Sequence, residues 1–121
     1  GITAKEISLG WTSQIDGVVI LPNDGTLTGE DNCTINCLIV GEGATIFFKD
    51  RLRLDTLIIL GPNVRITLGD DCRIETIESD YRFHLQTGQK FSNDIRVELQ
   101  DDYNLAVEIS ELVDLALEIE S

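Results

Sequence analysis

The chain repeats itself with a period of 18 to 20 residues, and this period limits its fold more than any other feature. Cut at these intervals, the sequence forms six rows that begin at Thr3, Leu21, Val40, Leu60, Ser79 and Leu99. The seventh place of each row is aliphatic, giving the column Leu9, Leu27, Ile46, Ile66, Leu85 and Leu105. A fixed repeat of this length is typical of stacked architectures in which each unit contacts only its neighbours. The sequence therefore predicts a solenoid.

Each row consists of short segments, which we call bursts, in which apolar and polar residues alternate. Turn residues separate one burst from the next. The segments 41–46, 61–66 and 69–74 each open on glycine and lead into an alternating strand. Three such bursts per row predict an all-β, parallel, three-sided β-solenoid of about six rungs, with residues 1–121 as one domain. An antiparallel meander would scramble the chemically matched columns. The alternative is a β-sandwich or jelly roll, which also has evenly spaced short strands.

Residues 111–118 have helical propensity, but the alternation of Val113, Leu115 and Leu117 predicts a strand there.

The columns also assign the three cysteines. Cys33 and Cys72 share an inward-facing column, whose other members are Ile15, Leu52 and Phe91. A third burst places Cys37 and Ile39 inward as well, in line with Leu57 and Ile59. Cys33 and Cys72 are two rows apart, about 9–10 Å at the spacing of strands, which is too far for a disulfide. We expect reduced, structural thiols, and unpaired cysteines favour the cytoplasm.

The net charge of −13 restricts the classes of partner. Phosphate recognition needs a basic surface, so neither nucleic acid nor an anionic membrane surface is expected to bind. No apolar run approaches 18 residues, so no membrane span is predicted. The charge favours cations and basic protein partners instead.

Stacking brings carboxylates from different rows together. One column contains Asp31, Asp50 and Asp70, with Asp71 beside the last. Clustered oxygen ligands suit Ca²⁺, which is the one cofactor that the sequence suggests. The alternative is a solvated acidic corner whose repulsion is offset by nearby cations, namely Lys49, Arg51, Arg53 and Arg73.

A second acidic column consists of Asp55, Glu75, Asp94 and Asp114. It is suited to meeting a basic protein surface. Paired carboxylates on a β-helix also raise the possibility of a carbohydrate-active fragment. However, rows of nearly constant length leave no room for a cleft, and the single histidine, His84, has no recognisable nucleophilic partner. The chain is therefore expected not to be an enzyme.

The turns carry a resemblance to a known family. The pattern Gly-x-x-[Ala/Val/Cys]-x-Ile occurs at Gly41, Gly61 and Gly69, within compact triangular rungs that cover most of residues 3–119. In this architecture the chain resembles the bactofilins, bacterial cytoskeletal proteins that form polymers from short three-sided β-helices. The resemblance implies a structural, polymer-forming role.

Both ends of a solenoid expose strand edges that can template end-to-end stacking. We therefore expect a non-enzymatic scaffold module whose partner is a second copy of itself. The residues predicted to form its interfaces are Ile7, Leu9, Trp11, Leu112, Leu115 and Leu117.

Overall fold

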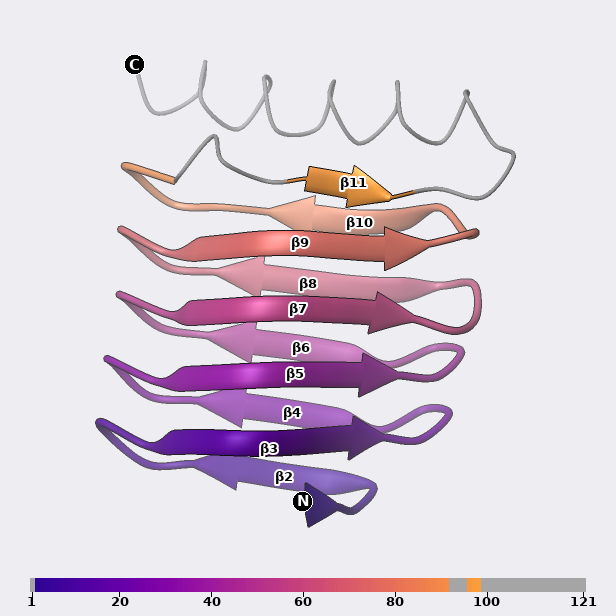
Figure 1. Ribbon diagram of the computed structural model, residues 1–121, viewed down its shortest axis with the longest axis horizontal. Helices are drawn as coiled ribbons and strands as arrows, with labels where there is room; N and C mark the ends of the chain where they lie inside the picture. The colour runs from indigo at the N-terminus through magenta and orange to yellow at the C-terminus, as the bar shows by residue number, and fades with distance from the viewer. Residues whose placement is uncertain (1, 92–95, 99–121) are drawn as a thin grey trace.

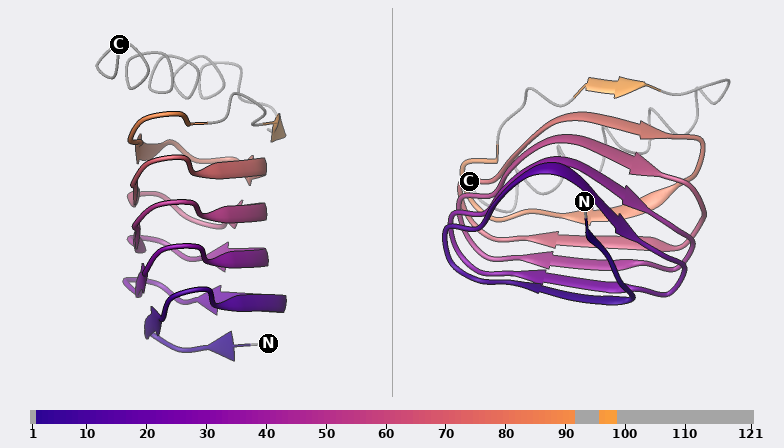
Figure 2. Two further views of the ribbon diagram at one scale, coloured as in Figure 1. Left: turned by 90° about the vertical axis from the view of Figure 1, so that its left-hand side faces the viewer. Right: turned by 60° about the horizontal axis from the view of Figure 1, so that its bottom comes forward.

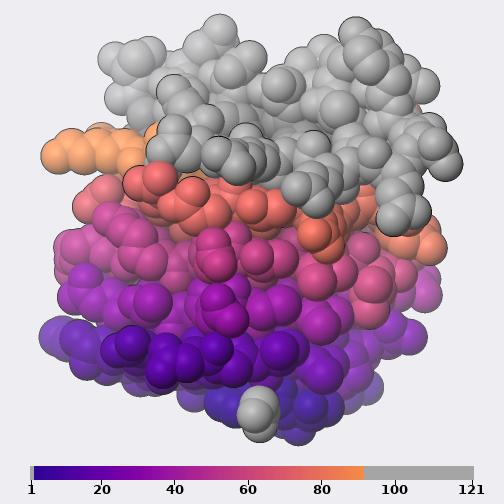
Figure 3. All heavy atoms as spheres, in the orientation of Figure 1, coloured from indigo at the N-terminus to yellow at the C-terminus, as the bar shows by residue number. Residues whose placement is uncertain are grey.

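The computed structural model describes residues 2–91 and, as a backbone strand, residues 96–98. It confirms an all-β parallel solenoid, with about four turns in this part of the chain. The turns stack as parallel layers along one axis (Figures 1 and 3). The predicted sixth row, with the strand expected at residues 111–118, lies outside the described residues, and so does part of the fifth.

Two parallel sheets form the walls of the solenoid. The six-stranded sheet is ordered β1 (Ile2–Thr3), β3 (Gln14–Leu21), β5 (Thr34–Val40), β7 (Arg53–Ile59), β9 (Arg73–Ser79) and β11 (Arg96–Glu98). The five-stranded sheet is ordered β10 (Phe83–Gln86), β8 (Val64–Leu68), β6 (Thr45–Phe48), β4 (Thr26–Gly29) and β2 (Glu6–Leu9). The chain alternates between the sheets, so every neighbour within a sheet is one full turn away in sequence.

The three predicted sides arise because the long strands bend in the middle. Ile35 pairs with Leu54 and Cys37 with Thr56, but the pairing is interrupted between them at Asn36. On either side of the bend, the strand has its own inward-facing residues. Each long strand therefore supplies two sides and each short strand the third, which gives the arched outline in Figure 2.

The core lies between the two sheets and is made of stacked aliphatic columns. The predicted column is observed from the second row onwards, where Leu27, Ile46, Ile66 and Leu85 pair in register and are all buried. Alternation along each short strand buries every second residue, as in the exposed–buried pattern of β4 and β6. Hydrophobic burial along these columns supplies the main stabilisation of the coil.

The predicted register of the first row is wrong. Ile7, and not Leu9, pairs with Leu27, while Leu9 pairs with Gly29. The cause is a short first corner. Ile2 pairs with Val19 and Ile7 pairs with Leu27, so the stretch from Ile2 to Ile7 is three residues shorter than the equivalent stretch of the next turn, from Val19 to Leu27. The row start at Leu60 is also displaced by one residue, because Val40 pairs with Ile59.

One corner of each turn contains a residue in the left-handed region. These residues are Thr12, Asn32, Arg51, Asp71 and Lys90, with φ between 54° and 63°. The backbone N–H groups of the first four reach the next turn, as in Asn32 N–H to the Asp50 carbonyl at 3.0 Å. The left-handed conformation is what turns the chain through this corner, and it suits Asn, Asp and Gly better than other residues.

Replacing Thr12 with asparagine should stabilise the protein by about 1 kcal/mol, because a β-branched residue is strained at φ 57°. Asparagine already occupies the equivalent corner of the next turn, at Asn32. Chemical denaturation followed by far-ultraviolet circular dichroism measures the change. Thr34→Asn, at an exposed strand position without positive φ, is the matched control and should not stabilise. Equal effects of the two substitutions would contradict the strain argument.

Candidate functional site

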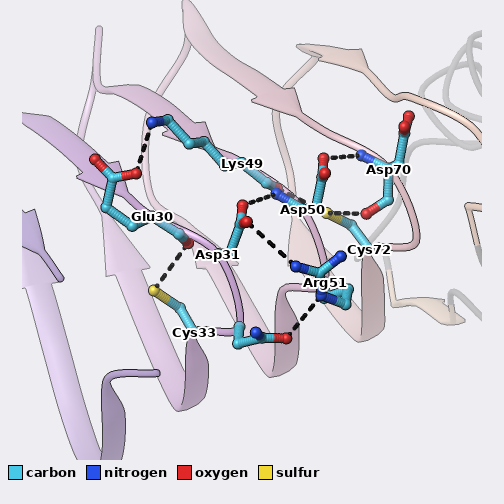
Figure 4. A network of polar contacts seen from close by, with 9 residues as sticks. Glu30, Asp31, Cys33, Lys49, Asp50, Arg51, Asp70 and Cys72 are labelled. Atoms are coloured by element: carbon cyan, nitrogen blue, oxygen red, sulfur yellow. Dashed lines mark hydrogen bonds and ion pairs between the residues drawn. The ribbon is translucent and has the colours of Figure 1, made fainter. Parts of the chain in front are cut away.

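The predicted acidic column exists as a hydrogen-bonded ladder along one corner of the solenoid. Asp31 Oδ1 accepts the backbone N–H of Asp50 at 3.1 Å, and Asp50 Oδ1 accepts that of Asp70 at 2.7 Å (Figure 4). Asp70 Oδ1 continues the series by accepting the Gln89 N–H at 2.8 Å. Each carboxylate therefore satisfies a backbone donor of the next turn, a charge-assisted hydrogen bond of the stronger kind.

Of the four cations expected to offset the repulsion along this ladder, Arg51 pairs with Asp31 and Arg53 with Asp71. Arg73 pairs instead with Glu75 of the second acidic column. Arg51 donates to Asp31 at 3.2 Å and to Asn32 at 2.9 Å, and Lys49 lies 2.6 Å from Glu30. Their side chains extend along the corner in Figure 4. The hydrogen bond and charge of Glu30 raise the pKa of Lys49. These pairs are largely exposed, so they reduce repulsion more than they stabilise the fold.

The geometry of the ladder gives the calcium hypothesis no support. Asp31, Asp50 and Asp70 each use one carboxylate oxygen for a backbone N–H, and Asp71 lies instead beside Arg53, at 3.5 Å. Among the described residues, no group of three or more His, Cys, Asp or Glu side chains is placed to hold a metal ion. Calcium binding at Asp31, Asp50, Asp70 and Asp71 stays a prediction for a direct measurement.

The corner also contains two of the three cysteines. Cys33 and Cys72 are buried as predicted, in a column with Leu52 and Phe91, but its first member is Ser13 and not Ile15. Ile15 pairs instead with Ile35, because the first row is displaced. The thiol of Cys33 donates to the Glu30 carbonyl at 3.3 Å. Burial raises the pKa of both buried thiols. All three cysteines are free, and the two buried ones serve as small core residues.

The second acidic column borders the bend of the six-stranded sheet. Asp55 and Glu75 lie side by side in β7 and β9, and Asp16 continues the column in β3. Asp94 and Asp114 lie outside the described side chains. A groove of about 250 Å³ runs along the bend and is also lined by Arg53 and Arg73. Arg73 forms an ion pair with Glu75, so the groove has both signs of charge.

The predicted interface residues are placed in two different environments. Ile7 and Leu9 point into the core, with 7% and 9% of their surface exposed, so only the backbone edge of β2 is open at this position. Trp11 is 72% exposed at the same end of the solenoid. Leu112, Leu115 and Leu117 lie outside the described residues.

The sequence interpretation missed an apolar outer surface on the six-stranded sheet. Cys37 and Ile39 were predicted to face inward, but Leu38 and Val40 do so, and Cys37 and Ile39 face outward. The strand alternation does not continue across the bend, because Asn36 and Cys37 both point away from the core there. The available signal was the length of the unbroken apolar runs, such as 37–40 and 57–60, which is typical of a sheet that is apolar on both faces.

His84 is exposed on β10, in register with Arg65. In the part of the chain that the structure describes, no helix is present that could cross a bilayer.

Comparison with protein-family models, with curated proteins and with solved structures finds no match to this chain.

Proposed function

We propose that the chain is a non-enzymatic assembly module that self-associates end to end through the open edge of its first turn. The supporting observation is that β2 is the last strand of the five-stranded sheet at the N-terminal end. β2 pairs with β4 on one side only. Unpaired strand edges of this kind template pairing with another chain.

The hydrogen-bonding pattern identifies which groups of β2 are available. The carbonyls of Lys5 and Leu9 accept N–H groups from the β4 turn, at 2.8 and 3.0 Å. In a parallel ladder, alternate residues direct both their N–H and C=O groups to the same side. The backbone groups of Glu6 and Ser8 therefore face away from β4, toward a partner strand. Exposed Trp11 adds apolar surface at the same end.

Charge on the sides of the solenoid is consistent with assembly along the axis. The net charge of −13 opposes lateral clumping of copies, whereas backbone pairing at the ends is much less sensitive to it. The resemblance of the triangular rungs to bactofilins supports the same role, because those proteins polymerise from short three-sided β-helices.

Ser8→Pro tests the proposal, because it removes an N–H from the free edge and leaves the groups that pair with β4 in place. Sedimentation velocity over a concentration series should show self-association of the unmodified chain and at least a tenfold weakening in the variant. Ser8→Thr, which keeps the N–H and matches Thr28 in the next turn, is the control and should assemble normally. A chain that stays monomeric at high concentration would rule the proposal out.

A further inference from the structure

Across β3, β5 and β7, part of the six-stranded sheet is apolar on its outer face as well as on its inner face. Between the bend and the next corner, β5 directs Leu38 and Val40 inward and Ile39 outward. Parallel pairing aligns Ile39 with Ile20 of β3 and Ile58 of β7. With Leu60 beyond the end of β7, these residues form what we call the outer isoleucine face: Ile20, Ile39, Ile58 and Leu60.

This face is open in the described structure. Ile20 is 39% exposed and Leu60 is 61% exposed, and a shallow hollow of about 480 Å³ beside them is bordered by Pro22 and Gly41. The stacked turns of the six-stranded sheet face the viewer in Figure 3. By contrast, an outward column of the five-stranded sheet is polar or charged, with Thr26, Thr45, Arg65 and His84.

Sheet architecture indicates what kind of element would cover such a face. Parallel sheets that are apolar on both faces are normally covered on both, most often by helices. Three strands in a row span about 10 Å between the outer two. This width matches the diameter of one α-helix with its side chains, about 10–12 Å.

The rim of the face carries more acidic than basic side chains, and this indicates a basic partner. Glu78 follows Ile58 in the same column, and Glu42 is exposed on the corner beside Gly41. Asp55 borders the face at the bend. Partial burial and the negative charges of Glu78 and Asp55 raise the pKa of the Cys37 thiol, which belongs to the neighbouring column together with Thr56. Lys5 is the single cation among the residues that line the hollow.

Copies of this chain are poor candidates to cover the face. Each copy has a net charge of −13, and residues 99–121 contain seven carboxylates and no Lys or Arg. Both would bring negative charge against an acidic rim. From the apolar stripe and this rim, we propose that the outer isoleucine face binds a basic amphipathic helix of another protein. The proposal does not depend on end-to-end assembly.

A synthetic peptide tests the proposal with the full chain. The probe is an 18-residue helix with leucine at positions i, i+3, i+4 and i+7 and lysine elsewhere, and its counterpart has glutamate in place of lysine. Fluorescence anisotropy at 50 mM salt should show binding of the lysine peptide and at least a tenfold weaker signal for the glutamate peptide. Salt at 500 mM should also weaken binding, because the Debye length becomes short.

Surface variants locate the binding. Ile20→Lys with Leu60→Lys should weaken binding of the lysine peptide at least tenfold, because both residues lie on the face and are well exposed. Thr45→Lys with Phe47→Lys, at two exposed positions of the five-stranded sheet away from the face, is the matched control and should change affinity less than twofold. If the first pair fails to fold by circular dichroism, Leu60→Lys alone replaces it.

Three outcomes would overturn the proposal. The first is that both pairs of variants weaken binding of the lysine peptide equally, and the second is that the glutamate peptide binds as tightly as the lysine peptide. The third is that the unmodified chain forms a dimer in sedimentation and that this dimer dissociates in the variant with Ile20→Lys and Leu60→Lys. That result would assign the face to a second copy of the chain. Ser8→Pro should bind the lysine peptide as the unmodified chain does, so a failure of end-to-end assembly is distinguishable from a failure here.

Discussion

Replacing Gly29 with alanine should destabilise the solenoid by about 3 kcal/mol, because a side chain at this position would overlap the ring of Phe48. Gly29 pairs in register with Phe48 of the next turn, and the ring is fully buried. The ring occupies the space left by the missing side chain, so it has nowhere to move without displacing other core residues. Urea unfolding followed by circular dichroism measures the loss.

A double-mutant cycle separates this overlap from a general effect of removing glycine. In the Phe48→Leu background, the smaller side chain should reduce the cost of Gly29→Ala by about 1 kcal/mol or more. Gly10→Ala is the matched control, since a methyl group at Gly10 would meet no atom within 4 Å, and it should change stability by less than about 0.5 kcal/mol. Additive effects in the cycle would show that Gly29 and Phe48 do not share this space.

Replacing Asp50 with alanine should destabilise the protein by about 1–3 kcal/mol, because the Asp70 N–H then loses its 2.7 Å acceptor at the corner. Asp50→Asn keeps an oxygen acceptor and should retain most of the stability. Asp55→Ala removes an exposed carboxylate from the second acidic column and should stay within about 0.5 kcal/mol of the original chain. Thermal unfolding of the three variants compares them directly.

The same variants test the calcium hypothesis. If the ladder bound Ca²⁺, millimolar calcium would raise the melting temperature of the unmodified chain, and Asp50→Asn or Asp70→Asn would abolish that rise. If the ladder acts only through backbone hydrogen bonds, calcium has no such effect and Asp50→Ala is the most damaging of these substitutions. Equal stability of Asp50→Ala and Asp50→Asn would contradict the hydrogen-bonding role.

The repeat period was sufficient to predict the coil, because a solenoid stacks equivalent residues and the stacking makes their chemistry match. Leu27, Ile46, Ile66 and Leu85 could be aligned by counting alone, and the structure pairs them. The first turn could not be aligned in this way. Its short corner shifts Ile7 into the column where Leu9 was expected, and no residue within the corner marks the missing length.

The bend in the long strands had the larger consequence for the candidate sites. Period-2 counting assumes a continuous strand, but Asn36 and Cys37 both point outward at the bend. The residues that follow therefore change phase, so that Leu38 faces the core and Ile39 faces solvent. The outer isoleucine face is visible only after this correction.

The sequence by itself determined the parallel solenoid, the inward column of the short strands from the second row onwards and the grouping of acidic residues at one corner, because all three follow from a constant repeat. Only the tertiary structure decided what those groups do. The direction of a carboxylate depends on which donor the neighbouring turn presents, and at this corner it presents the backbone N–H of Asp50 and Asp70. A column of matching residues shows that side chains lie together; the corner conformation decides which atoms they contact.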